Sequence, residues 1–242
     1  MRPDLTVRSR PPSVERPVLP AAVLWDMDGT LVDTEPCWMA AEERLVHRFG
    51  GTWTQADAEA MVGLALLDGA QVLAAHGVDL PAEQIVELLL DSVVEAVAEG
   101  PIWRPGVLEL LAALGDAGVP CALVTMSYRR FAEAVTAQMP VGAFAVVVTG
   151  EQVTHGKPHP EAYLLAARLL GVEVSRCVAI EDSVPGVGSA VASGARTLAV
   201  EHIVAVDDRP GLSRADSLTD VGLAELGRIA AGEVLDLRTP TT

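Results

Sequence analysis

Groups able to take part in phosphoryl transfer recur in this chain where short apolar segments end. Asp26 and Asp28 follow AAVLW, Thr125 ends CALVT, Lys157 comes shortly after AVVVT, and the pair Glu181–Asp182 ends CVAIE. Carboxylate oxygens are ligands that suit Mg²⁺, while a hydroxyl and an ammonium group stabilise phosphoryl oxygens. Because phosphoryl transfer needs chiefly positioning and charge stabilisation, these residue types could together perform it.

The two aspartates of DMDGTLVD raise a question of charge. Asp26 and Asp28 leave the same side of an extended chain, because side chains alternate with a period of two. Two like charges so placed raise each other's pKa unless a cation intervenes. One carboxylate can serve as a nucleophile through an aspartyl-phosphate, while a second protonates the departing alcohol and later activates water. Asp-Gly is also common in surface turns, so these residues alone leave a turn open.

The lysine stands out by composition. Of 17 basic residues, sixteen are arginines and one is Lys157. An ammonium is a compact point charge that a planar guanidinium does not replace, which favours a specific role over a solvated loop charge. We expect the flanking His155 and His159 to be loop residues, because Mg²⁺ prefers oxygen ligands.

Five apolar segments predict buried strands, over residues 21–25, 121–125, 145–149, 177–181 and 196–200. Their hydrophobicity is continuous and not alternating, which indicates a parallel sheet covered on both faces. Segments of helical period lie between the later ones, over residues 129–138, 161–171 and 185–194. This alternation predicts an α/β fold with a Rossmann-like parallel sheet, in which ligands bind at the carboxyl ends of the strands. The chemical groups described above lie at those ends.

Residues 35–103 differ, because they show helical patterning and no convincing strand. An insert of roughly 70 residues is far longer than a loop, so we expect a separate helical cap over 35–103. The α/β core would then comprise residues 21–34 and 104–242. The first twenty residues hold four arginines and five prolines, and we expect them to form a disordered extension.

Composition narrows the class of protein. Half of the 242 residues are apolar and 21% are charged, as in ordinary globular proteins. The net charge of −16 argues against a nucleic-acid partner. No apolar segment approaches the roughly 18 residues of a membrane span, nor is there a secretory h-region. The odd cysteine count without CxxC spacing favours reduced thiols, for Cys37, Cys121 and Cys177. We therefore expect a cytoplasmic monomer with neither nucleic-acid nor membrane partners.

Four segments, taken in order, resemble the motifs of the haloacid dehalogenase superfamily of phosphatases and phosphomutases. They are DMDGTLVD, LVTMS with Thr125, HGKPHPEAY with Lys157, and AIEDSVPGVGSAVASG. The resemblance covers nearly all of the chain after Pro20 and is nearest to the subgroup with a helical cap after the first motif. That subgroup includes beta-phosphoglucomutase and small-sugar phosphatases.

The resemblance implies roles for these residues. Asp26 would be the nucleophile and Asp28 the acid/base, with Thr125 and Lys157 completing the catalytic set. Mg²⁺ would be held by Asp26, the Asp28 carbonyl, Asp182 and Glu181. We expect the substrate, a small phosphorylated metabolite, to contact Gly29, Thr30, Thr125, Ser127 and Lys157. Asp182–Ser183 ahead of Pro185 also fits the start of a helix.

A phosphatase acting on a sugar or polyol monophosphate is favoured over the alternative, a mutase. A histidine that the mutase uses in proton transfer corresponds to Trp38, and the segment MVGLALLDG lacks the arginine that holds a second phosphate. Leu64, Leu66 and Leu67 either form an apolar rim for the leaving group or only pack the cap. Arg129 and Arg130 are expected to face solvent. A non-catalytic binder stays open, whereas a dinucleotide site is disfavoured, because Val191 replaces the third glycine of its fingerprint.

Overall fold

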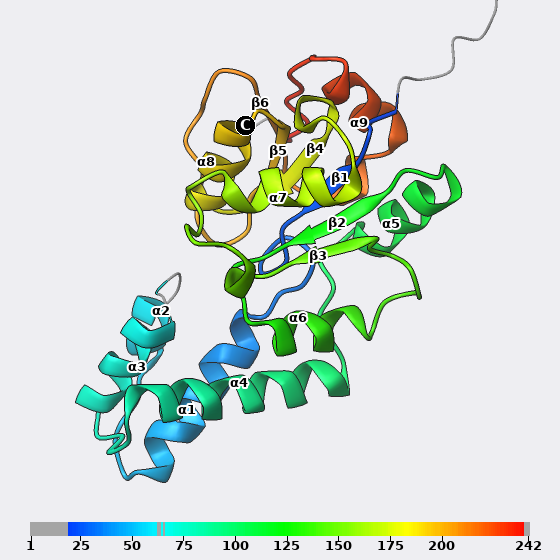
Figure 1. Cartoon of the computed structure of the whole chain (residues 1–242). Coiled ribbons are helices and arrows are strands. Elements are labelled where there is room, and N and C mark those ends of the chain that lie inside the picture. The colour runs from blue at the N-terminus through cyan, green and yellow to red at the C-terminus, as the bar shows by residue number, and fades with distance from the viewer. Residues whose placement is uncertain (1–18, 62–63, 65, 240–242) are drawn as a thin grey trace, which may run out of the picture.

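The computed structural model describes residues 19–61, 64 and 66–239 and has an α/β fold (Figure 1). Its sheet has six parallel strands in the order β3-β2-β1-β4-β5-β6. The strands are β1 (Val23–Trp25), β2 (Cys121–Val124), β3 (Val146–Val148), β4 (Val178–Glu181), β5 (Arg196–Val200) and β6 (Leu212–Ala215). The predicted parallel α/β architecture is confirmed.

The five strands expected from apolar segments are present, and β6 is an addition. Its sequence LSRA has no continuous apolar character, yet all four residues are buried. The Arg214 guanidinium is neutralised by Glu201 and Asp208 and also donates to the Val206 carbonyl. These partners come from the loop between β5 and β6, and they allow an arginine to be buried. A pattern of hydrophobicity does not register such polar partners, and it therefore missed this strand.

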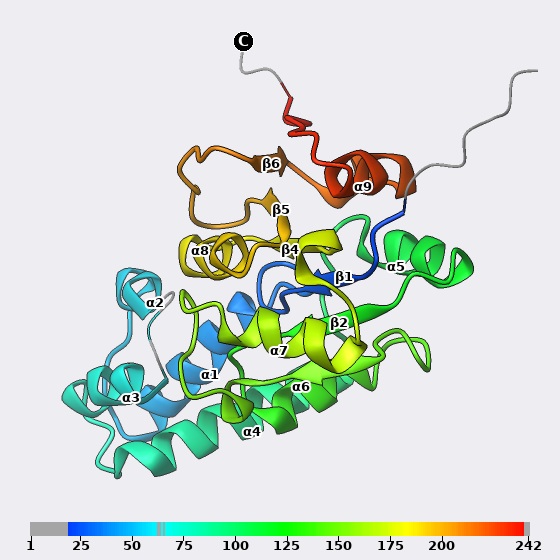
Figure 2. The ribbon, with the colours of Figure 1, turned by 45° about the horizontal axis from the view of Figure 1, so that its top comes forward.

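Helices cover both faces of the sheet, because side chains of each strand alternate between them. Leu24 packs with α7 (Glu161–Leu170) and α8 (Val184–Ser193) in one apolar cluster. Val23 and Trp25 point to the other face and belong to a cluster with α5 (Val107–Asp116), α6 (Arg129–Thr136) and α9 (Leu223–Ala230). Figure 2 shows these two layers. The sequence patterns had singled out neither α5 nor α9.

A helical insert separates β1 from α5 and β2. It contains α1 (Glu35–Arg48), α2 (Gln55–Met61), α3 (Leu66–Ala75) and α4 (Ala82–Glu99). Residues 62, 63 and 65, between α2 and α3, lie outside the described residues. Helix α4 packs along α6 (Figure 1), and one apolar cluster continues from the sheet into the insert.

Three further expectations concern the rest of the chain. Residues 1–18 lie outside the described residues, so the disordered extension over 1–20 stays a prediction. Within the described ranges, no helix is both long and apolar enough to cross a bilayer. All three cysteines are free thiols, with Cys121 and Cys177 buried and Cys37 half-buried.

Candidate active site

The site lies where the order of the strands reverses. From β1 the chain proceeds to β2 and β3 on one side and returns to β4, β5 and β6 on the other. Trp25 of β1 is paired with Ile180 of β4, so that Asp26 and Glu181 come one residue later on adjacent strands. Ligands of open α/β sheets bind beside such a reversal, at the carboxyl ends of the strands.

Lys157 reaches this edge from the loop before α7. Its Nζ donates to Asp26 Oδ1 at 2.6 Å, to Glu181 Oε1 at 2.7 Å and to the Val124 carbonyl at 2.9 Å. The side chain is only 6% exposed. An ammonium group has three protons, and three acceptors surround it. Lys157 therefore fixes one oxygen of Asp26 and joins three strands of the sheet.

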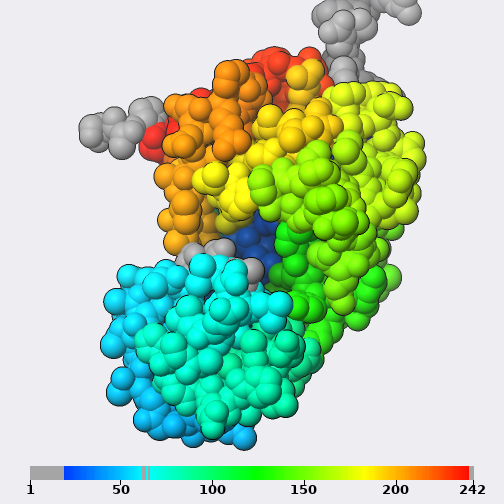
Figure 3. Space-filling view, turned by 60° about the vertical axis from the view of Figure 1, so that its left-hand side comes forward, coloured from blue at the N-terminus to red at the C-terminus, as the bar shows by residue number. Residues whose placement is uncertain are grey.

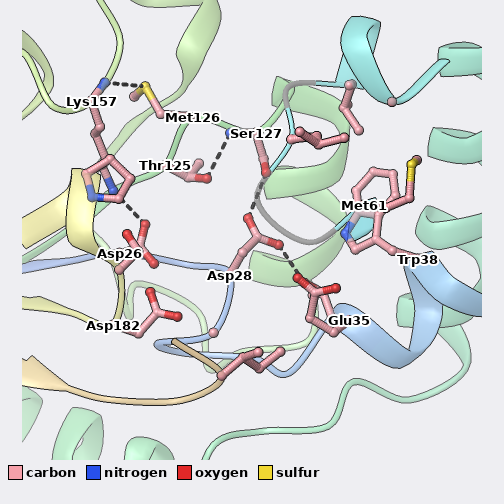
Figure 4. Close-up of a pocket in the computed structure, with 18 of the residues that line it drawn as sticks. Asp26, Asp28, Glu35, Trp38, Met61, Thr125, Met126, Ser127, Lys157 and Asp182 are labelled. Atoms are coloured by element: carbon pink, nitrogen blue, oxygen red, sulfur yellow. Dashed lines mark hydrogen bonds and ion pairs between the residues drawn. The ribbon is translucent and has the colours of Figure 1, made fainter. Parts of the chain in front are cut away.

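Asp28 is held separately, with each carboxylate oxygen accepting one hydroxyl hydrogen bond. Thr34 donates to Oδ1 at 2.8 Å and Ser127 donates to Oδ2 at 2.7 Å. The Thr125 hydroxyl, in turn, accepts from the Ser127 amide at 3.0 Å. Burial raises the pKa of Asp28, and the hydroxyl hydrogen bonds oppose that rise. The second aspartate is thus oriented by the loop after β2 and by the residue before α1, away from Lys157 (Figure 4).

Asp182 lies beside the turn after β1, because the backbone at Gly29 approaches its carboxylate closely. Gly29 has φ +82°, and a Cβ there would lie 2.0 Å from Asp182 Oδ2. Thr30 donates a long hydrogen bond of 3.4 Å to Asp182 Oδ1. Only glycine adopts this left-handed conformation readily and also has no side chain that would collide with Asp182. The turn after β1 therefore packs directly on a carboxylate supplied by the end of β4.

Glu181, the last residue of β4, is fully buried. Besides Lys157, its Oε1 accepts from the Tyr163 hydroxyl at 2.7 Å, and its Oε2 accepts from the Ser183 hydroxyl at 3.2 Å. Ser183 is also the N-cap of α8 and accepts from the Gly186 amide, which confirms the predicted helix start. These donors compensate for the burial of a carboxylate.

The carboxylates crowd one another despite the lysine. Burial, followed by the charge of Glu181, raises the pKa of Asp26 to about 7, with Lys157 opposing the rise. Burial and the charges of Asp26 and Glu181 raise the pKa of Asp182 to about 8. Burial lowers the pKa of Lys157, but Asp26 and Glu181 outweigh it and the net pKa is raised. The site therefore holds more negative charge than its lysine neutralises.

This donor set fits a divalent metal ion. Oxygens of Asp26, Glu181 and Asp182 lie within 4.8 Å of one another. All three are hard ligands of the kind that Mg²⁺ selects, and a cation between them would relieve the repulsion that raises the pKa of Asp26 and Asp182. Glu181 is the least available of the three, because its oxygens already accept from Lys157, Tyr163 and Ser183.

A cavity of about 560 Å³ opens above these groups, between the sheet edge and the insert. Figure 3 shows the recess, with the blue residues after β1 at its base and the insert below it. The predicted residues that line it are Asp26, Asp28, Gly29, Thr125, Ser127, Lys157 and Asp182. Thr30 and Glu181 lie behind this lining, as partners of Asp182 and Lys157.

The insert supplies a wall that the sequence analysis had described only in part. It comprises Glu35, Trp38, Glu42, Met61, Leu64, Leu66, Leu67, Gly69 and Leu89. The three leucines of the expected rim thus line the cavity, although Leu66 also packs on the core cluster. The sequence analysis had not predicted Glu35 and Glu42 as site residues. Their spacing of three and four residues from Trp38, which places all three on one face of a helix, could have indicated them.

Other residues that the sequence singled out lie away from the cavity. Arg129 is exposed, and Arg130 pairs with Glu87 at 3.1 Å and Asp91 at 2.8 Å of α4. His155 and His159 are exposed, and His155 lies 3.0 Å from Glu161. Tyr163 was not predicted as a site residue, because an aromatic in a helical stripe is indistinguishable from core packing by pattern alone.

The fold and the site together are those of an enzyme. A buried ammonium group fixes a carboxylate at the edge of a cavity that is large enough to enclose a small molecule. Comparison with known proteins gives the family. Residues 20–194 match the model described as haloacid dehalogenase-like hydrolase. Hexitol phosphatase A of Escherichia coli is 34% identical over 198 residues, which cover 80% of this chain and 87% of that protein.

Two more similarities agree with this match. The N-acetylmuramic acid 6-phosphate phosphatase of Pseudomonas aeruginosa is 35% identical over 208 residues, covering 82% of this chain and 90% of that protein. The crystal structure of CbbY from Rhodobacter sphaeroides in complex with phosphate has a TM-score of 0.75 and 28% identity, covering 86% and 99% of the two chains. The chain belongs to the haloacid dehalogenase-like hydrolases and is a phosphoric monoester hydrolase.

Proposed function

We propose that this enzyme hydrolyses a small phosphorylated metabolite, a sugar or polyol monophosphate, in a Mg²⁺-dependent reaction through an aspartyl-phosphate on Asp26. The observation that carries the proposal is the 2.6 Å contact of Lys157 with Asp26 beside a second, separately held aspartate, Asp28. Relatives named hexitol phosphatase A, N-acetylmuramic acid 6-phosphate phosphatase and phosphorylated carbohydrates phosphatase support the substrate class.

The first step forms a bond from an Asp26 oxygen to phosphorus and breaks the bond from phosphorus to the leaving oxygen. Lys157 holds Asp26 Oδ1, which leaves Oδ2 as the attacking atom. Asp28 gives its proton to the departing oxygen, so that a neutral alcohol leaves. Thr125, Ser127 and Lys157, which line the cavity, orient the phosphoryl oxygens.

The second step reverses the direction of proton transfer. Asp28, now a carboxylate, takes a proton from water as its oxygen attacks the phosphorus of phospho-Asp26. The bond from phosphorus to Asp26 breaks, and inorganic phosphate and the original Asp26 carboxylate result. Hydrogen bonds from Thr34 and Ser127 keep Asp28 oriented for both transfers.

The metal ion would be held by Asp26, Asp182 and the Asp28 carbonyl, with Glu181 as a further carboxylate beside them. Mg²⁺ supplies charge that neutralises the phosphate and the crowded carboxylates. This charge also lets the site accept an anionic substrate in a protein whose net charge is −16.

Residues 35–103 act in this proposal as a cap that excludes water while the aspartyl-phosphate exists. The described part of its cavity wall contains no lysine, arginine or histidine. A phosphosugar mutase has to hold a second phosphate at the end remote from its aspartate. The wall therefore favours hydrolysis over the mutase.

The test is phosphate release from a panel of sugar, polyol and nucleotide monophosphates, with and without Mg²⁺. Asp26→Asn is expected to abolish release while its circular dichroism spectrum and Tm stay near those of the wild type. Asp28→Asn should retain binding but lose the acid/base step. The matched control is Asp116→Asn, which makes the same change at an exposed position in α5 and should leave release unchanged.

Rapid quenching with acid followed by mass spectrometry of peptides tests the intermediate. Phosphate covalently attached to the peptide that contains Asp26 is expected in the wild type. Normal Mg²⁺-dependent turnover by Asp26→Asn would refute the assignment of the nucleophile. Conversion of β-glucose 1-phosphate to glucose 6-phosphate without release of phosphate would instead establish the mutase.

A further inference from the structure

Helix α1 turns one face toward the cavity, and this face is acidic. Glu35, Trp38 and Glu42 all line the cavity, and their spacing of three and then four residues places them on one side of the helix. Figure 4 shows Glu35 and Trp38 beyond Asp28, on the opposite side from Asp26, Asp182 and Lys157. A phosphate bound at Asp26 would therefore have its leaving group directed at α1.

Glu42 is the unusual member of this face. It is only 5% exposed, and its Oε2 atom has no hydrogen-bond partner in the protein. A buried polar atom normally has a partner, and one without a partner costs free energy. Apart from Glu35 and Glu42, the wall that the insert gives the cavity is apolar, with Met61, Leu66 and Leu89 among its residues.

The basic side chains that line the cavity lie against acidic groups other than Glu42. Among the described lining residues, the basic ones are Lys157 and His202. Lys157 donates to Asp26, Glu181 and a carbonyl, and His202 Nε2 lies 3.2 Å from Asp33 Oδ1. Neither basic residue pairs with Glu42, which lines the cavity and has one carboxylate oxygen, Oε2, buried without a partner in the protein.

We propose that Glu42 forms a subsite for the leaving group, where it accepts a hydrogen bond from a donor on the sugar or polyol remote from the phosphate. This inference rests on the proposed phosphatase activity and adds to it. A hydroxyl or an ammonium group can donate to this carboxylate. A leaving group with a carboxylate or a second phosphate is rejected there, because Glu35 and Glu42 repel it and no cation compensates.

Shape and size agree with such a ligand. A cavity of about 560 Å³ falls within the usual range for small-molecule sites of about 300–1,000 Å³. The part of its wall that the insert supplies is apolar, apart from the two glutamates. Apolar surface packs against the carbon skeleton, while a single acceptor at the far end distinguishes a polyol from an apolar alcohol, as hydrogen-bonding sites do with high selectivity.

The test compares selectivity, not total activity. Wild type, Glu42→Gln and Glu42→Leu are assayed with Mg²⁺ at a pH of about 9, above the pKa of about 7 to which burial raises Glu42, so that Glu42 is a carboxylate. The four substrates are sorbitol 6-phosphate, glucosamine 6-phosphate, fructose 1,6-bisphosphate and p-nitrophenyl phosphate. The last has no donor on its leaving group, so each kcat/KM is divided by the value for p-nitrophenyl phosphate in the same variant. Glu43→Gln and Glu43→Leu are the matched controls, because Glu43 is the exposed neighbour in α1.

For Glu42→Leu we expect the sorbitol 6-phosphate ratio to fall about 10- to 100-fold, the effect of losing a hydrogen bond to a charged group. Glu42→Gln retains an acceptor oxygen, so it should keep most of the ratio if a hydroxyl is the donor. A loss of the glucosamine 6-phosphate ratio in the same variant identifies an ammonium donor. Both Glu42 variants should raise the ratio for the bisphosphate, and the Glu43 variants should change none of these ratios.

The outcomes separate the two levels of the proposal. If the wild type releases phosphate but the ratios of Glu42→Leu equal those of the Glu43 controls, the subsite is refuted and the phosphatase stands. If the wild type releases no phosphate from any of the four, the proposed function itself fails. The Tm of each variant shows that it is folded, and Glu42→Gln keeps the comparison valid if the leucine disturbs packing.

Discussion

Glu42 also makes a prediction about stability that does not depend on any substrate. Burial, followed by the charge of Glu35, raises the pKa of Glu42 from its ordinary value of 4.5 to about 7. Replacement by glutamine keeps the size of the side chain and removes its ionisation. The free energy of unfolding of wild type and Glu42→Gln should therefore depend differently on pH.

The sign and size follow from the two pKa values. Between pH 4.5 and about 7 the folded protein keeps a proton on Glu42 that the unfolded chain has lost. Folding is then linked to proton binding, so the wild type loses stability as the pH rises through this range. Each pKa unit corresponds to about 1.4 kcal/mol, which makes the loss up to about 3 kcal/mol. Glu42→Gln does not undergo this loss. Its unfolding free energy relative to that of the wild type should therefore rise up to a pH of about 7 and then level off.

Urea unfolding followed by tryptophan fluorescence, at pH values from about 5 to about 8, measures this difference directly. Glu43→Gln removes the same charge from an exposed position in the same helix and controls for net charge. A difference between wild type and Glu42→Gln that stays constant over this pH range would refute the reasoning. The same conclusion would follow if Glu43→Gln gave an equal trend.

Three further perturbations test the site. Tyr163→Phe removes the hydroxyl that donates to buried Glu181 at 2.7 Å and should cost about 1–3 kcal/mol of unfolding free energy in urea; an unchanged midpoint would contradict this. Gly29→Ala adds a Cβ 2.0 Å from Asp182 Oδ2 at φ +82° and should lose both stability and kcat, whereas Gly118→Ala, with φ +69° and open space, should cost only the conformational strain of about 1–2 kcal/mol. Chelation by EDTA should abolish phosphate release, and added Mg²⁺ should restore it and raise the Tm; activity that persists after chelation would exclude metal dependence.

The core of the site could be predicted because it lies at the ends of apolar strands. Asp26, Thr125, Lys157 and Asp182 each follow or end a segment whose continuous hydrophobicity identifies a parallel strand. Parallel strands bring their carboxyl ends to one edge, so the order of motifs along the chain already predicts their proximity. Strand β6 lacked this signal, because Arg214 interrupts its hydrophobicity and is buried through ion pairs with Glu201 and Asp208 of the preceding loop.

The opposite wall of the cavity depended on tertiary packing. In the sequence, Glu42 is one of two adjacent glutamates in an amphipathic helix, and nothing in the local pattern distinguishes it from Glu43, which is exposed. Glu42 is buried and Glu43 is exposed because one side of α1 turns toward the edge of the sheet. That orientation depends on contacts between segments that are distant along the chain. The sequence by itself therefore determined the carboxylates, the hydroxyl and the lysine that meet at the edge of the sheet, since strand pattern and the order of the motifs are properties of the chain. Only the tertiary structure decided which side chains of the insert lie across the cavity from them, since that depends on how the insert packs over the core.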